Sequence, residues 1–268
     1  MSGKRGSGTK CELTAAQRRF FGCLSLVLIA AVWQLMSMRI GKSFLLPSPS
    51  DVLGCLWENR AEIFLVHFPA TLEVILKGGV LSVLIGAVFA VLMDNSSMLC
   101  RALYPILTAT QTVPIMCLSP IFVLWFGYTV KMRVTAVVLV NFFSVTVNLY
   151  DGLASTDRNR EELMRTFGAG RLQIFTMLKM PSALPYFFTA LHIVVPWSVI
   201  TAAVAEWLGA QNGLGTYSRA CMLKLDAAGL IAPLIVLSAF ALIMNAILNM
   251  AERHFLKPVN GGREVKKS

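Results

Sequence analysis

Three side chains that can carry a charge lie within or beside long apolar stretches of this sequence: Lys77, His192 and Glu206. Ionisable groups inside a membrane usually mark a proton relay or an ion path, because a charge in lipid is costly. Lys77 and Glu206 stand near the ends of their stretches, where a long side chain reaches water. A lone histidine such as His192 is more typical of a residue hydrogen-bonded to a neighbouring helix. We therefore predict no proton relay.

The sequence lacks the residue patterns of an enzyme or of a metal site. It contains no Ser/His/Asp set, no His-Glu-x-x-His motif and no pair of carboxylates within one apolar stretch. None of its six cysteines forms a Cys-x-x-Cys pair, and no histidine has metal-ligand spacing. We predict no catalytic residue, no metal and no cofactor. A disulfide between Cys55 and Cys221, the two cysteines predicted outside the membrane, is left open.

Polar side chains within the apolar stretches form a candidate pathway for a small molecule. Two of them adjoin Pro114, and three share one face of the next stretch at positions i, i+3 and i+7. These residues are Gln111, Thr112, Asn141, Ser144 and Asn148. Polar groups in a span face the bundle or a cavity. The other interpretation is hydrogen bonding between helices, worth about 0.6 kcal/mol each.

The longest polar segment between apolar stretches, 151–185, predicts a docking element. Residues 160–167 lack proline and glycine and form a short helix, which Gly168 and Gly170 end. The apolar edge of this helix is Leu163, Met164 and Phe167. A second amphipathic stretch follows, and we expect Pro181 to stop it. A short helix with an apolar edge ringed by charge fits a partner's groove; the alternative is a solvated loop.

Composition shows which elements must position these residues. The chain has 268 residues, of which 56% are hydrophobic and 14% charged, whereas a soluble domain has about a quarter charged residues. A helix of roughly 20 apolar residues crosses a bilayer. We predict an all-α membrane protein with one membrane domain at 20–250. Its six spans are 20–38, 72–93, 102–126, 132–150, 186–205 and 229–250.

Two of these spans have distinctive local patterns. The second carries Ser82, Gly86 and Ala90 at four-residue spacing, which predicts close packing against another helix. The third is interrupted by prolines at 105, 114 and 120. A proline frees backbone carbonyls that neighbouring protein or water must satisfy. We therefore expect the third span to lie inside the bundle.

Charge distribution predicts the orientation. With the amino terminus inside, 16 Lys and Arg fall in inner segments and 7 in outer ones, so both tails, 1–19 and 251–268, are expected in the cytoplasm. The segment 151–185 then also lies inside. This topology accounts for the net charge of +10, and we expect no nucleic-acid partner.

The polar segment resembles the cytoplasmic signature of the permeases of ABC importers. That signature reads Glu-Ala-Ala, three residues, Gly, nine residues, Ile-x-Leu-Pro. Glu162, Gly168 and Pro181 match it at the required spacing, and other apolar residues replace the two alanines, the Ile and the Leu. In the family this segment is the coupling helix that inserts into a cleft of the ATPase subunit.

Further motifs resemble the nitrate, sulfonate and taurine group of these permeases. They are Leu46-Pro47-Ser48-Pro49, Gln111-Thr112-Val113-Pro114-Ile115, Leu124-Trp125-Phe126-Gly127 and Ala205-Glu206-Trp207-Leu208-Gly209-Ala210. Others look most like the branch associated with pyrimidine precursors of thiamine. These are Asp151-Gly152-Leu153, Pro185-Tyr186-Phe187-Phe188 and Asn212-Gly213-Leu214-Gly215-x-Tyr217.

The resemblance implies a type I importer permease of the MetI-like fold in a bacterial inner membrane. It implies a homodimer, ATPase subunits inside, a solute-binding protein outside, a small-molecule substrate and ATP-driven alternating access. The chain itself would not be an enzyme. An alternative is a secondary transporter driven by an ion gradient. That class needs buried ionisable pairs, and the sequence indicates none.

Overall fold

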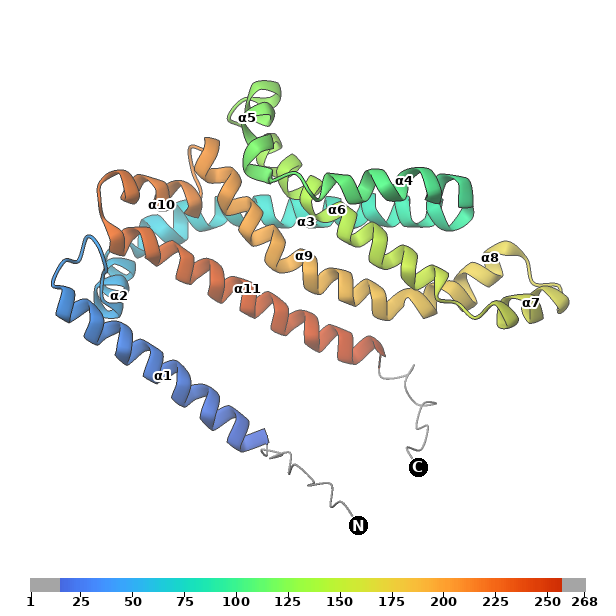
Figure 1. Cartoon of the computed structure of the whole chain (residues 1–268), viewed down its shortest axis with the longest axis horizontal. Coiled ribbons are helices and arrows are strands. Elements are labelled where there is room, and N and C mark those ends of the chain that lie inside the picture. The colour runs from blue at the N-terminus through green and yellow to red at the C-terminus, as the bar shows by residue number, and fades with distance from the viewer. Residues whose placement is uncertain (1–14, 257–268) are drawn as a thin grey trace, which may run out of the picture.

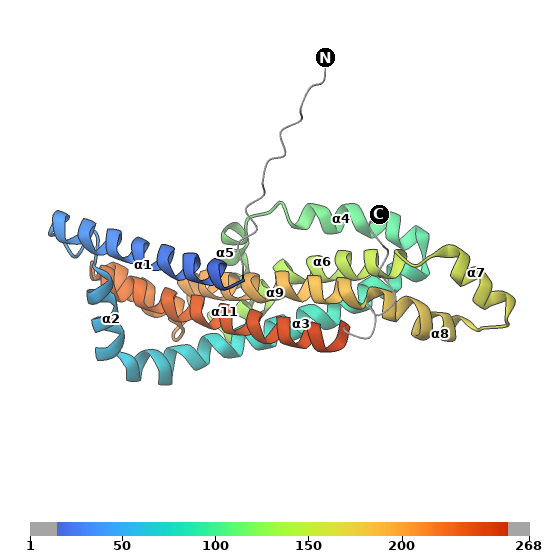
Figure 2. The same ribbon diagram turned by 90° about the horizontal axis from the view of Figure 1, so that it is seen from below.

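The computed structural model describes residues 15–256, and every regular element in that range is a helix. The predicted tails, 1–19 and 251–268, fall partly outside it. Figures 1 and 2 show an elongated bundle with α7 (Arg158–Thr166) and α8 (Arg171–Ile174) at one end. At the opposite end lie α2 (Pro49–Glu58) and α10 (Leu214–Leu223).

Four helical segments are long and apolar enough to cross a membrane. The first is the π-helix η1 (Glu62–His67) continued by α3 (Phe68–Asn95), and the second is α6 (Val130–Ala154). The third joins α8, the π-helix η2 (Phe175–Lys179) and α9 (Met180–Gly209), and the fourth is α11 (Ala227–Leu256). These segments contain the predicted second, fourth, fifth and sixth spans.

The predicted third span is a broken one. It consists of α4 (Ser97–Thr110) and α5 (Ile115–Phe126), which meet at an angle of 98°. Pro114 caps α5 with extended backbone, and a residue that precedes a proline, as Val113 does, disfavours helix. Pro105 and Pro120 lie inside the two halves. Figure 1 shows α5 turned away from the bundle.

The predicted first span, 20–38, lies within α1 (Ala15–Ile40). Its apolar part, Leu24–Ile40, is shorter than the 18 residues that each of the four long segments exceeds. The described residues therefore contain four spanning helices, or five with the bent pair, and the count of six stays a prediction.

Close packing of α3 on α6 is confirmed. Ser82 and Ala90 are fully buried, and a Cβ added at Gly86 would stand 2.6 Å from the Cβ of Val145. A Cβ added at Gly78 would likewise stand 2.6 Å from the Cβ of Val137. Small residues let the two backbones approach, which increases van der Waals contact where lipid supplies no hydrophobic driving force.

The expectation that Pro181 stops the second amphipathic stretch is wrong. The helix runs without interruption from Arg171 to Gly209. Pro181 occupies the first turn of α9, directly after the wide π-helical turn of η2. Proline within a spanning helix is tolerated where a local π-helical adjustment satisfies the backbone groups that it frees.

Candidate functional site

The α7 helix is built from local polar interactions. The carboxylate of Asp157 caps it by accepting the N–H of Asn159 at 2.9 Å. One turn along, Arg165 donates to Glu161 at 2.7 Å, and this hydrogen bond lowers the pKa of Glu161 below its ordinary value. Glu162 pairs with Arg158 at 3.3 Å, with both side chains exposed.

The apolar edge of α7 is available to a partner. Phe167 is 81% exposed and Leu163 56%, while Met164 is half-buried. The chain then turns at Gly168, whose φ of +80° suits glycine. Nothing lies within 4 Å of a Cβ added there, so backbone conformation rather than space selects glycine.

A cavity of about 560 Å³ adjoins the break between α4 and α5. Gln111 and Ser144 line it, and the amide of Gln111 donates to the hydroxyl of Ser144 at 3.4 Å. Thr110 of α4 and, from α9, Trp197 and Thr201 complete the polar part of the wall. The described residues that line this cavity are all uncharged, so it offers hydrogen bonds and apolar contact without a formal charge.

The structure separates the five predicted pathway residues. Gln111 and Ser144 share the cavity, whereas Asn141 is buried and donates to the hydroxyl of Ser198 on α9 at 2.9 Å. Thr112 and Asn148 hydrogen-bond to their own backbone segments, at Ala109 and Ser144.

Sequence analysis did not find the α9 wall of this cavity. Four residues of α9 line it at positions i, i+4, i+7 and i+8, which is one face of a helix. They are Ile193, Trp197, Ile200 and Thr201. A tryptophan and a threonine four residues apart within an apolar stretch could have indicated this face.

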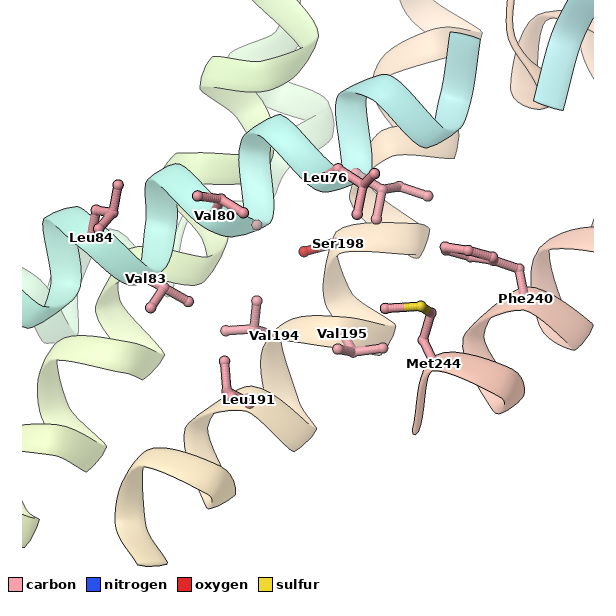
Figure 3. A pocket seen from close by; sticks show the side chains of 12 residues that line it. Leu76, Val80, Val83, Leu84, Leu191, Val194, Val195, Ser198, Phe240 and Met244 are labelled. Atoms are coloured by element: carbon pink, nitrogen blue, oxygen red, sulfur yellow. The ribbon is translucent and has the colours of Figure 1, made fainter. Parts of the chain in front are cut away.

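A second cavity, of about 310 Å³, lies between α3, α9 and α11 (Figure 3). Leu76, Val80, Val194 and Met244 are among the side chains around it, and Ser198 supplies a hydroxyl. That hydroxyl already accepts the amide of Asn141. The smaller cavity therefore suits apolar groups, and the cavity beside Gln111 is the candidate site for a polar molecule.

The expectation that Glu206 reaches water from a helix end is wrong. Its side chain is fully buried. One carboxylate oxygen, Oε2, accepts the hydroxyl of Thr71 at 3.0 Å and the N–H of Gly215 at 2.8 Å. The other oxygen, Oε1, lies 3.7 Å from Arg133 and has no hydrogen-bond partner among the described residues.

Buried side chains around Glu206 hold the junction between α9 and α10 residue by residue. The N–H of Gly213 donates to His67 at 3.1 Å, and that of Leu214 donates to Thr71 at 2.8 Å. Arg133 donates to the carbonyl of Asn212 at 3.1 Å. Backbone donors that would otherwise be buried without a partner are thereby satisfied, which fixes this turn.

Lys77 and His192, the other two ionisable side chains within the apolar stretches, are also paired. Lys77 bonds Glu73 one turn earlier on α3, at 2.5 Å. His192 contacts Asn245 at 2.8 Å and Glu252 at 2.9 Å, both on α11. The prediction of a hydrogen-bonded histidine is confirmed. The expectation that buried ionisable pairs are lacking is wrong, because folding joins residues far apart in the sequence.

Cys55 and Cys221 are free thiols that both interact with Tyr217. Burial raises the pKa of each thiol above its ordinary value. Because both thiols are free, the structure contains no disulfide between these two described residues.

Comparison with known proteins identifies the family of this membrane chain. The model of the family described as "Binding-protein-dependent transport system inner membrane component" matches residues 82–257. The chain belongs to this family. The permease is 43% identical over 233 residues to the formylaminopyrimidine transport permease protein ThiX of Halalkalibacterium halodurans, covering 87% of this chain and 93% of that protein. Its resemblance to the thiamine-precursor branch is thus confirmed.

A more distant relative and a solved structure are also transport proteins. The permease is 26% identical over 251 residues to the taurine transport system permease protein TauC of Escherichia coli K12, covering 88% of this chain and 87% of that one. A solved structure of the MetNI methionine ABC transporter, in an inward-facing conformation, matches with a TM-score of 0.64 at 17% identity. That match covers 75% of the permease and 97% of the other chain, and it shows the MetI-like fold.

Proposed function

We propose that this permease is the membrane-spanning subunit of an ATP-driven importer, and that α7 docks into a groove of its ATPase. The observation that carries the proposal is the exposed apolar edge of α7, at one extreme end of the bundle. Exposed apolar side chains on a charged helix gain free energy when a partner covers them. Leu163 and Phe167 would enter the groove, Met164 would pack at its rim, and Glu162 would lie beside it.

The rest of the proposed assembly follows from the position of α7. The end that carries α7 would face the cytoplasm, together with both termini, and the end that carries α2 and α10 would face a solute-binding protein. Two copies of the permease would form the transport unit. Gly168 would let the chain turn back towards the membrane, and Pro181 would lie within the continuous helix that re-enters it.

The proposed substrate is a small, uncharged organic nutrient of the formylaminopyrimidine type. The similarity to ThiX, a formylaminopyrimidine transport permease, supports this choice, and so does the uncharged lining of the 560 Å³ cavity. A formylaminopyrimidine has N–H donors on its nitrogen substituents and acceptors at its ring nitrogens and formyl oxygen, which Gln111 and Ser144 complement. A sulfonate such as taurine would need compensating positive charge, because an unpaired charge in a low-dielectric cavity is costly.

The test reconstitutes the permease with an ATPase subunit and a solute-binding protein from the same organism. ATP-dependent uptake of a formylaminopyrimidine into proteoliposomes is expected, with taurine failing to compete. Phe167→Ser should weaken ATPase copurification by roughly ten- to hundred-fold, as for the loss of one buried anchor. Leu223→Ser, which changes a 71% exposed leucine at the opposite end, is the matched control. Equal copurification of both variants with the ATPase refutes docking through α7.

One observation favours a second candidate function, transport driven by an ion gradient. Such transporters use buried ionisable groups, and the pair of Arg133 and Glu206 is buried. Uptake into vesicles that contain the permease alone, with an imposed proton or sodium gradient and no ATP, tests it. Uptake that requires ATP and the ATPase subunit rejects this second function.

A further inference from the structure

A single ion pair ties the segment that follows α7 to the end of α3. The amine of Lys179 lies 2.9 Å from each carboxylate oxygen of Asp94. The two residues are 85 positions apart in the chain, and their side chains are only 18% and 8% exposed. A pair with this geometry and burial is screened much less by salt than a surface pair, so it joins the two elements firmly.

The α7 helix itself has little other attachment to the bundle. None of its residues, all of which the structure describes, is buried. A cavity of about 270 Å³ lies between it and the end of α3, lined by Asp94, Glu161, Arg165 and Lys179. Charged side chains from α7 and from the bundle therefore face the same space. Lys179 also lowers the pKa of Glu161, after the larger effect of Arg165. The charge of Lys179 therefore acts on a residue of α7.

Lys179 occupies a place where the helix can bend. It is the last residue of η2, and none of the five residues of η2 is buried. A single π-helical turn within a long helix is a common cause of kinks and is often found at functional sites. If α7 and α8 move, the helix can therefore bend at η2 while most of α9 stays in place.

The other half of the pair lies at the base of α4. Asp94 is the second-last residue of α3, and α4 begins at Ser97. Ser96 caps α4 by accepting the N–H of Leu99 at 3.3 Å. The far end of α4 is the break beside Gln111, which lines the larger cavity. A continuous path therefore runs from Lys179 through Asp94 and along α4 to the candidate substrate site.

We propose that Asp94 and Lys179 are positioning residues that transmit movement of the docked α7 to α4 and thereby to the substrate cavity. The inference rests on the proposed docking of α7 to an ATPase. It assigns the two residues to neither ATP hydrolysis nor substrate contact. Breaking the pair should separate ATP hydrolysis from transport, while leaving the ATPase bound.

The experiment uses the complete reconstituted importer, with the ATPase and binding protein present, and measures ATP hydrolysis and formylaminopyrimidine uptake on the same vesicles. The variants are D94N, K179Q, the neutral pair D94N/K179Q and the charge swap D94K/K179D. The neutral pair leaves no buried charge uncompensated, so it keeps the test valid if the single variants fail to fold. The control is E73Q/K77Q, which removes an exposed ion pair within α3 that joins no two elements.

We expect the single variants and the neutral pair to lower uptake per ATP hydrolysed by about 2- to 30-fold, the usual range for residues along a coupling path. The charge swap should restore the ratio, and the control should leave it unchanged. An unchanged ratio in the neutral pair, or a swap that stays uncoupled, overturns the inference. Failure of the wild-type permease to copurify with the ATPase instead overturns the proposed function.

Discussion

Replacing Glu206 with alanine should loosen the junction between α9 and α10 and destabilise the whole permease. The carboxylate is the buried acceptor for Gly215 and Thr71, and it is the buried charge nearest to Arg133. Alanine removes the acceptor and the charge together. Thr71 keeps a second acceptor, the carbonyl of His67 at 3.2 Å, so Gly215 and Arg133 carry most of the cost.

The magnitude follows from these two groups. A buried donor left without an acceptor costs about 1–3 kcal/mol, and a buried charge that loses its partner costs about 3–5 kcal/mol. Arg133 retains the carbonyl of Asn212 and lies 3.7 Å from the carboxylate, which places its share at or below the lower limit. We expect a total of about 4 kcal/mol, or a melting temperature lowered by about 8–16 °C for a protein of this size.

The assay is thermal unfolding of the purified permease in detergent. Glu206→Gln serves as the matched comparison, because its carbonyl oxygen can still accept from Thr71 and Gly215. It loses only the charge opposite Arg133, so we expect a smaller cost of about 1.5–3 kcal/mol. In a Glu206→Gln background, Arg133→Met should recover stability, since it removes the uncompensated charge. Equal melting temperatures for wild type, Glu206→Ala and Glu206→Gln refute the reasoning.

Three further predictions concern docking, transport and thiol chemistry. Gly168→Leu should weaken ATPase copurification more than Gly168→Asn, because a left-handed backbone costs most residues about 1–2 kcal/mol and asparagine less; equal copurification contradicts this. Gln111→Leu should lower uptake about fivefold through loss of one hydrogen bond, while the control Thr112→Val keeps wild-type uptake. Alkylation of Cys55 in a single-cysteine variant should be slower at pH 8 than that of free cysteine and should still rise above pH 9.0, since burial raises the pKa of its thiol from 9.0; a plateau below that pH rejects the assignment.

Much of the fold was predictable because membrane spans are set by local composition. Apolar length located the four long helices, and small residues at four-residue spacing indicated that α3 packs closely against another helix, without saying which one. The boundaries of the spans were harder to predict from the sequence, because a helix can continue beyond the membrane. The helix that contains α9 does so, through Pro181 and η2. The prolines of the third span predicted an irregular helix, but the angle of its break depends on how α4 and α5 pack.

The candidate site was harder to predict because it depends on contacts between distant segments. The apolar edge of α7 could be predicted, since its helix is local. Ser198, the partner of Asn141, lies 57 residues away in the chain, and Thr71, one partner of Glu206, lies 135 residues away. No local pattern indicates contacts over such separations. Glu206 was misread for this reason: its position near a helix end suggested solvent, whereas α10 folds back over it.

The break between α4 and α5 also brings two helix ends to the wall of the candidate substrate cavity. The end of α4, at Thr110 and Gln111, and the start of α5, at Ile115 and Met116, both line the wall. Helix ends carry partial charges of opposite sign. Because the lining side chains are uncharged, these backbone partial charges would act on a bound molecule without a formal charge beside them. A side-chain substitution that leaves the break in place also leaves these backbone partial charges in place.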